Sequence, residues 1–193
     1  VEVQVLTALP NYPKMEVFEM YKKKKNREET IDGIKVFRSW IYVSKSKSII
    51  ARLLNYFSFV FSSYFRGRRL GNYDYLMVES PPLFLGYSAI ALAKRTKAKL
   101  IFNVSDLWPE SAEKLQIVNN KKILKMAYSL EAKCYKKAFL ITGQTQGIVK
   151  DIKSRFSEKM VHWLPNGVDT DYYNPQLKSR STFRQTNGIN DQD

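Results

Sequence analysis

The sequence has little of the chemistry that supports disulfide, metal or dinucleotide sites. Its 193 residues include one cysteine and one histidine. Cys134 alone excludes an intramolecular disulfide and fits a reducing compartment. His162 lacks a nearby set of partner ligands, so no metal site is expected and we interpret it as a strand residue. The segment 143–147 (Gly-Gln-Thr-Gln-Gly) lacks the full dinucleotide fingerprint, which disfavours a Rossmann oxidoreductase.

Long hydrophobic runs are also missing. A membrane span needs about 20 predominantly apolar residues, and the richest segment, 48–70, is interrupted by Arg52, Asn55 and Ser58. Its periodicity predicts a helix, which could face the core with its aromatics on a sheet or lie at a membrane surface. Two adjacent stripes form its wide apolar face: Ile49, Leu53, Tyr56, Val60 and Tyr64, and Ile50, Leu54, Phe57, Phe61 and Phe65.

Acidic charge is scarce relative to basic charge. The formal net charge of +14 favours an anionic partner such as a phosphate or an anionic lipid surface. Residues 1–70 hold 14 Lys and Arg against 6 Asp and Glu, and residues 71–193 hold 18 against 12, so the excess is densest near the start. The run Lys22–Lys25 fits either solvation or anion binding. No zinc-finger or RNP pattern is present, so nucleic acid is not an expected partner.

The remaining pattern alternates strands with helices. This alternation predicts one α/β domain with a parallel, doubly wound sheet. Residues 11–29 have no sustained period and predict a long loop. Strands are expected at 1–6, 31–40, 76–79, 98–104, 138–142 and 160–164, and helices at 48–70, 84–95, 121–137 and 144–156.

Two of the predicted strands end in polar, acidic and aromatic clusters. The strand at 98–104 runs into Ser-Asp-Leu-Trp-Pro-Glu-Ser at 105–111, and the strand at 160–164 runs into Pro-Asn-Gly-Val-Asp at 165–169. Ligands of open α/β sheets bind beyond the carboxyl ends of the strands. We therefore expect Asp106 and Asn166 to lie along one shared crevice.

These segments carry a resemblance to a known family. Together with Ala-Leu-Pro-Asn-Tyr-Pro at 8–13, Glu-Ser-Pro-Pro-Leu at 79–83 and Thr-Gly-Gln-Thr at 142–145, their order and spacing resemble family 4 glycosyltransferases. The most similar members are bacterial enzymes that build O-antigen, capsule and exopolysaccharide. The resemblance covers residues 1 to about 175. It implies a GT-B architecture, in which two Rossmann-like halves, each a parallel sheet with helices on both faces, meet at a cleft.

The resemblance also implies a domain assignment. Residues 1–174 correspond to the N-terminal, acceptor-binding half without the family's first strand, glycine-bearing loop and helix. Residues 175–193 are expected to be a linker or disordered tail. The C-terminal donor half, with its paired glutamates, has no counterpart in these residues. A fragment of this kind is expected to be inactive alone.

The activity implied is retaining transfer of a sugar from a nucleotide-diphosphate sugar to a polyprenyl-diphosphate-linked saccharide. It requires no other cofactor, and it places the enzyme in the cytoplasm, peripheral at the inner face of the cell membrane. The alternative from composition is a basic module that binds nucleic acid or a membrane surface without catalysis.

Asp106 is the predicted catalytic residue. A carboxylate in the crevice can orient or partly deprotonate an acceptor hydroxyl and stabilise positive charge at the anomeric carbon. Its alternative role is to cap the turn before Trp108 and Pro109. Trp108 fits stacking on the acceptor or a core contact, and Glu110 fits acceptor binding or a favourable interaction with a helix dipole.

The other site residues follow the resemblance, by position along the chain. The predicted acceptor-binding residues are Asn11, Tyr12, Glu79, Ser80, Trp108 and Glu110, and the residues near the cleft and donor are Thr142, Gln144, Thr145, Asn166 and Gly167. Gly167 would permit a positive backbone angle or a close ligand approach. Asp169 is interpreted as a residue that holds its own turn.

Overall fold

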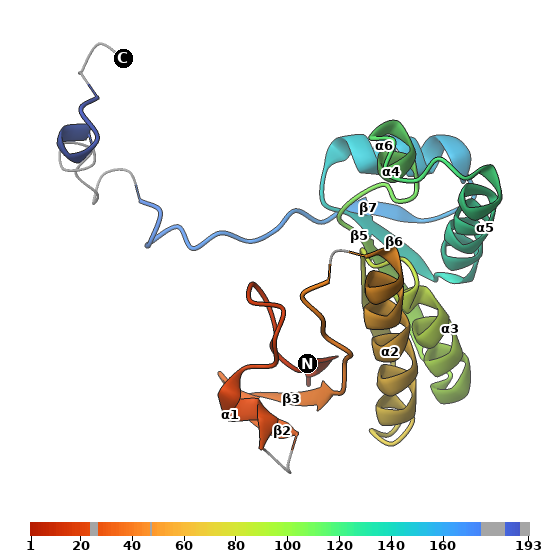
Figure 1. Cartoon of the computed structure of the whole chain (residues 1–193). Coiled ribbons are helices and arrows are strands. Elements are labelled where there is room, and N and C mark those ends of the chain that lie inside the picture. Colours follow the sequence, from red (N-terminus) through yellow and green to blue (C-terminus); the bar gives the residue numbers. More distant parts are fainter. Residues whose placement is uncertain (24–26, 47, 175–183, 190–193) are drawn as a thin grey trace.

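The computed structural model describes residues 1–23, 27–46, 48–174 and 184–189 (Figure 1). Most of the expected tail at 175–193 lies outside the described residues. The chain begins with a three-stranded sheet in the order β1-β3-β2, where β1 is parallel and β2 antiparallel to β3. Its elements are β1 (Gln4–Ala8), α1 (Glu19–Lys22), β2 (Glu28–Ile31) and β3 (Ile34–Ser39).

A second, four-stranded sheet follows in the order β4-β5-β6-β7, and all its pairs are parallel. Helices flank it, which confirms the predicted α/β class with a Rossmann-like parallel sheet. The strands are β4 (Tyr75–Ser80), β5 (Lys99–Val104), β6 (Leu140–Gly143) and β7 (Val161–Trp163), and the helices are α2 (Ile49–Gly67), α3 (Leu85–Thr96), α4 (Glu110–Lys114), α5 (Lys121–Lys137) and α6 (Gln146–Arg155).

The predicted long loop at 11–29 is wrong in part, because it contains α1 and the start of β2. The strand predicted at 31–40 is also divided. Asp32 and Gly33 both adopt positive φ, 50° and 79°, and turn the chain between β2 and β3. An Asp-Gly pair is a preferred two-residue hairpin turn because both residues tolerate this backbone region. The turn chemistry therefore overrides the apolar alternation.

The main core lies between the parallel sheet and one layer of helices. Successive crossovers step in one direction from β4 to β7, and right-handed connections then place α3, α5 and α6 on the same face. Phe102, Ile141 and Cys134 are almost fully buried in this core. Of the helices predicted on both faces of the sheet, those on this face are present, and the described residues add no helical layer over the other face, where Tyr75 and Met77 of β4 are about half exposed.

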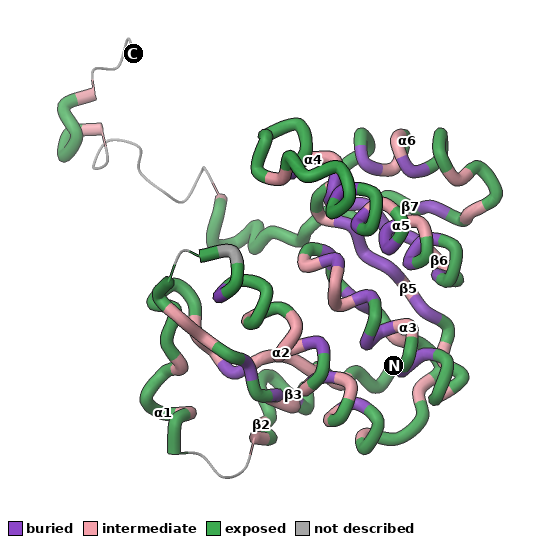
Figure 2. The backbone as a smooth tube through the Cα atoms, turned by 45° about the vertical axis from the view of Figure 1, so that its right-hand side comes forward, coloured by how far each residue is buried: buried purple, intermediate pink, exposed green. Residues whose placement is uncertain are grey.

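Helix α2 packs against α3 and the three-stranded sheet through a narrow face (Figure 2). Ser48 caps its N-terminus by accepting a hydrogen bond from the Ala51 amide. Its buried positions are Ala51, Val60, Ser63 and Gly67. One of the two predicted apolar stripes, from Ile50 to Phe65, is mostly exposed. The interpretation of α2 as a helix whose aromatics all pack on the core therefore does not hold.

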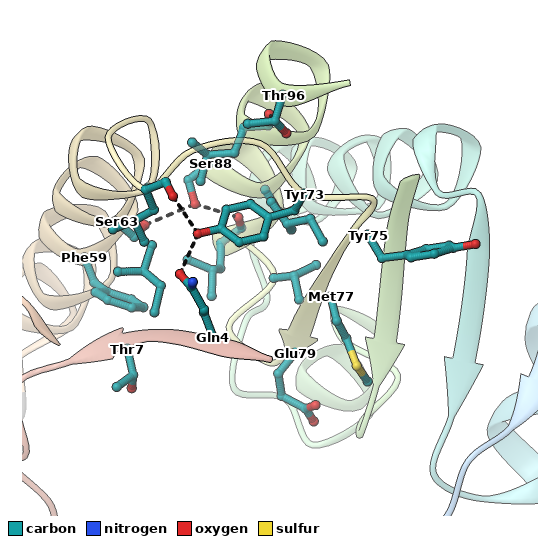
Figure 3. A pocket seen from close by; sticks show the side chains of 18 residues that line it. Gln4, Thr7, Phe59, Ser63, Tyr73, Tyr75, Met77, Glu79, Ser88 and Thr96 are labelled. Atoms are coloured by element: carbon teal, nitrogen blue, oxygen red, sulfur yellow. Dashed lines mark hydrogen bonds between the residues drawn. The ribbon is translucent and has the colours of Figure 1, made fainter. Parts of the chain in front are cut away.

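A cavity of about 370 Å³ separates the two sheets, between the edge strands β1 and β4 (Figure 3). Its walls are mainly apolar and include Leu6, Phe59 and Leu92. The Tyr73 hydroxyl reaches across it and donates a 2.6 Å hydrogen bond to Gln4 Oε1. Glu79 lies at the rim of the same cavity. The cavity therefore adjoins, at Glu79, the polar edge described below.

Helices α3 and α5 are in close contact at Gly86. A Cβ at this position would lie 2.3 Å from the Cys134 sulfur, which is far inside van der Waals contact. We expect Gly86→Ala to lower the free energy of unfolding by about 1–3 kcal/mol, although alanine favours helix. Urea unfolding of the purified chain measures this change.

The Cys134→Ala background gives the control for this prediction. It removes the sulfur and leaves only a Phe102 carbon at 3.5 Å and the residue 134 Cβ at 3.8 Å near the new methyl group. In that background the cost of Gly86→Ala should fall to near zero. An equal cost in both backgrounds would show that the sulfur contact is not its cause.

Candidate functional site

A row of three polar side chains crosses neighbouring strands at the carboxyl edge of the parallel sheet, where the C-terminal ends of the strands meet. Glu79 of β4 pairs in register with Asn103 of β5, which pairs with Thr142 of β6. Paired residues point to the same face of a sheet. The Thr142 hydroxyl donates a 2.6 Å hydrogen bond to Asn103 Oδ1, and Asn103 Nδ2 donates to the Glu79 carboxylate. Asn103 and Thr142 are buried, so this relay fixes the orientation of Glu79.

Two loop residues complete the surroundings of Glu79. The Ser105 hydroxyl donates a hydrogen bond to Oε1 of Glu79, and Gln144 Nε2 lies 3.4 Å from the same Oε1 atom. Gln144 Nε2 also donates a 2.9 Å hydrogen bond to Asn166 Oδ1. The residues that end β4, β5 and β6, together with the loop after β7, therefore form one continuous hydrogen-bonded network.

Asp106 lies beside this network at the end of β5. Its side chain is exposed, and its Oδ2 accepts a 2.8 Å hydrogen bond from the Ser111 hydroxyl of α4. The carboxylate therefore keeps most of its acceptor capacity directed away from the protein. Since the strands are parallel, Asp106 and Asn166 lie along the same edge of the sheet, as expected from the sequence.

The two other predicted residues of this loop have structural contacts. Trp108 is partly buried against the core, and its ring packs edge-on to Phe84 with centroids 5.7 Å apart. Glu110 is in the first turn of α4 and forms an ion pair with Lys114. Helix α4 is held to α5 by Tyr128, which donates to Glu113. Burial, followed by this hydrogen bond, raises the pKa of Tyr128 to about 12.

Other predicted residues lie outside the network. Asn11 Nδ2 donates a hydrogen bond to the Leu9 carbonyl, and Tyr12 is 81% exposed. Both residues follow β1, which belongs to the three-stranded sheet. Ser80 is buried next to Glu79, with its carbonyl accepting from the Ser105 amide. Thr145 caps α6 by accepting from the Ile148 amide at 3.2 Å.

The positive backbone angle predicted for Gly167 is wrong, while the close approach of a ligand stays a prediction. Its φ is not in the positive region, and an added Cβ would meet no atom within 4 Å. The nearby Asp169 does hold its turn, because Oδ1 accepts from the amides of Asp171 and Tyr172. His162 is an exposed residue of β7, as predicted from the sequence. The loop after β7 is thus held by the hydrogen bonds of Asp169 within its own turn and by the hydrogen bond between Asn166 and Gln144.

Asn103 and Ser105 are the site residues that sequence reasoning missed as individuals. A signal existed for Asn103, because an amide inside an otherwise apolar parallel strand has to find a buried partner. Its partner could only be identified from the register that sets it between Glu79 and Thr142. Ser105 belongs to the quoted motif, but its contact with β4 depends on the turn after β5.

The geometry limits the chemistry available at this edge. The accessible carboxylates of Glu79 and Asp106 and the amides of Gln144 and Asn166 can bind a polyhydroxylated ligand, and the carboxylates can accept a proton from it. Within the described ranges, no group of three or more His, Cys, Asp or Glu side chains is arranged to hold a metal ion. None of the helices described is both long and apolar enough to cross a membrane.

The fold and this edge together define an α/β protein with a network of polar side chains beyond the strands of a parallel sheet. No family model matches the sequence. Over 107 residues the chain is 34% identical to a protein of Escherichia coli (strain K12) described as "Putative colanic acid biosynthesis glycosyl transferase WcaI". The match covers 54% of this chain and 26% of that protein, so the chain aligns with about a quarter of its relative.

Proposed function

We propose that this chain is the acceptor-side part of a retaining, family 4, GT-B glycosyltransferase of surface polysaccharide biosynthesis. The observation that carries the proposal is the network of Glu79, Asn103 and Thr142 with Gln144 and Asn166 at the carboxyl edge of the sheet. The similarity to a glycosyl transfer protein of colanic acid biosynthesis supports the same class. We expect the full-length enzyme to act in the biosynthesis of a surface polysaccharide such as O-antigen or capsule.

The proposed reaction joins an acceptor hydroxyl to the anomeric carbon of a nucleotide-diphosphate sugar. The bond from that carbon to the diphosphate breaks, and its electron pair leaves with the nucleoside diphosphate. Asp106 accepts the hydroxyl proton as the new glycosidic bond forms and stabilises positive charge at the anomeric carbon. Among the described residues its carboxylate accepts a hydrogen bond from Ser111 alone, which leaves it available for this role.

We assign acceptor binding to the polar edge on both sides of Asp106. Glu79, oriented by Asn103 and Ser105, can accept hydrogen bonds from sugar hydroxyls. The Gln144 and Asn166 side chains lie farther along the edge, where a donor domain would close the cleft. In this proposal, polypeptide outside these 193 residues supplies that domain and binds the nucleotide.

The acceptor we propose is a polyprenyl-diphosphate-linked saccharide, used at the cytoplasmic face of the cell membrane. A lipid-linked acceptor requires an enzyme that works at an anionic surface, and the net charge of +14 is suited to one. The reaction needs no cofactor beyond the nucleotide sugar. Nucleic acid is not a partner in this proposal.

The test is transfer from radiolabelled nucleotide sugars to lipid-linked saccharides, by this chain and by the intact parent enzyme. We expect the parent to release nucleoside diphosphate with one donor, and the 193-residue chain to give no turnover. Normal turnover by the 193-residue chain would refute the assignment to an acceptor-side half. Absence of transfer by the parent with every donor would refute the proposed activity.

A further inference from the structure

Helix α2 exposes a continuous apolar stripe to solvent. Ile50, Leu54, Phe61 and Phe65 are 71%, 51%, 62% and 52% exposed. They are spaced four, seven and four residues apart, so they lie on one side of the helix. The buried positions of α2 face α3 and the three-stranded sheet, and nothing in the described part of the chain covers the stripe.

Basic residues lie at the C-terminal end of this stripe, in a stretch of sequence without acidic residues. Residues 33–73 contain eight Lys and Arg but no Asp or Glu, and of these cations Arg38, Lys45 and Arg66 form ion pairs with glutamates of the preceding segment. Arg52 is exposed near the start of α2, and Arg68 and Arg69 are exposed just after its end. The Arg68 guanidinium lies 5.0 Å from the centre of the Phe65 ring. A surface with this charge pattern is complementary to an anionic one and repels a second copy of itself.

Aromatic residues with polar ends lie beside the helix. Trp40 and Tyr42 are 50% and 36% exposed, in the segment after β3 that runs along α2. The segment is held there because Ser62 donates to the Trp40 carbonyl and Asn55 to the Tyr42 carbonyl. Trp and Tyr are typical of the interface between lipid headgroups and acyl chains.

We infer that the exposed stripe of α2 docks on an anionic lipid surface. In this arrangement the helix lies in the plane of the interface with Ile50, Leu54, Phe61 and Phe65 in the acyl boundary, while Arg68 and Arg69 contact headgroup phosphates. The docking does not depend on the proposed glycosyl transfer.

The helix also contacts the candidate site through a short row of rings. Phe57 of α2 lies 5.0 Å from Phe84, and Phe84 lies 5.7 Å from Trp108 in the loop after β5. Docking through α2 therefore sets the carboxyl edge close to the lipid surface. A hydroxyl on a lipid-linked ligand would then reach the site without the lipid leaving the membrane.

The test is flotation of the purified chain with phosphatidylcholine vesicles, with and without phosphatidylglycerol. We expect binding only with phosphatidylglycerol, and weaker binding as salt increases. The variant with Phe61→Gln and Phe65→Gln should bind at least about tenfold more weakly, because two half-exposed rings lose their transfer free energy. Arg68→Gln with Arg69→Gln should weaken binding by about tenfold or more and reduce its salt dependence.

The matched control is Ile123→Gln with Met126→Gln, which removes side chains of similar exposure, 52% and 72%, from α5. It should bind vesicles like the unmodified chain. Circular dichroism checks that each variant is folded. The inference is overturned if the chain does not float with phosphatidylglycerol, if the α5 and α2 variants bind equally, or if sedimentation shows a dimer that the α2 variant dissociates.

Discussion

Replacement of Arg155 by alanine is expected to lower the free energy of unfolding by about 3–5 kcal/mol. Arg155 of α6 donates two hydrogen bonds, of 2.8 and 2.9 Å, to the carboxylate of Glu131 on α5. Glu131 is only 1% exposed. Without the guanidinium, its carboxylate would be buried beside the core with no opposite charge.

The environment of Arg155 explains why one residue matters this much. Its Nε also binds Asp151 at 2.9 Å, and its guanidinium lies over the Phe156 ring. The hydrogen bonds to Glu131 raise the pKa of Arg155 above its ordinary value, and the opposing effect of desolvation is smaller. The residue therefore stays charged at every accessible pH. This cluster fixes α6, whose N-terminal loop carries Gln144, against α5.

Urea unfolding of Arg155→Ala measures the effect. Arg52→Ala is the matched control, because Arg52 is exposed on α2 and should change stability by no more than about 0.5 kcal/mol. The double variant Glu131→Met with Arg155→Met should recover most of the loss, since no charge then remains buried. A loss for Arg155→Ala no larger than that for Arg52→Ala would contradict the role of the pair.

The second large effect concerns turnover. In the intact enzyme, Asp106→Asn is expected to lower kcat by about 10²–10⁴-fold, the usual contribution of a positioned general base. Asparagine has the same shape and can still accept the hydrogen bond from Ser111, so the fold should be retained. It cannot take up the hydroxyl proton, and it cannot balance positive charge at the anomeric carbon. The loss should therefore fall on kcat more than on KM.

Two companion variants separate this role from a general effect of charge. Asp74→Asn removes a carboxylate just before β4, at the opposite edge of the same sheet, and should leave kcat unchanged. Glu79→Gln places an amide against the donors Asn103, Ser105 and Gln144, and should raise KM by disordering the acceptor site. If kcat of Asp106→Asn were unchanged, Asp106 would not be the general base, and Glu79 would be the other carboxylate at this edge that could act as one.

Local signals predicted the regular elements of this chain well. The helix at 121–137 was placed with its observed bounds, because Asn120 caps it and its apolar residues keep one period. The β2–β3 hairpin was missed even though Asp32-Gly33 is a local turn signal, because the alternating pattern on both sides was interpreted as one strand. Both outcomes depended only on neighbouring residues.

Features that depend on distant residues could not be predicted in the same way. The exposed stripe of α2 is more apolar than the buried positions Ala51, Val60, Ser63 and Gly67, and only packing on α3 and the three-stranded sheet decides which face is covered. The relay from Thr142 through Asn103 to Glu79 needs the register of three strands. The sequence predicted which loops meet at the edge, but not which side chains connect them.

The most direct test of the account is to map where a short-chain polyprenyl-diphosphate monosaccharide binds to this chain by amide chemical shifts. We predict the largest shifts at the carboxyl edge of the parallel sheet, at Ser80, Ser105, Asp106, Gln144 and Asn166. The opposite edge also offers a polar hollow with cations, at Lys97 and Lys99 beside Asp74. Shifts confined to that edge, or none at saturating ligand, would contradict the account.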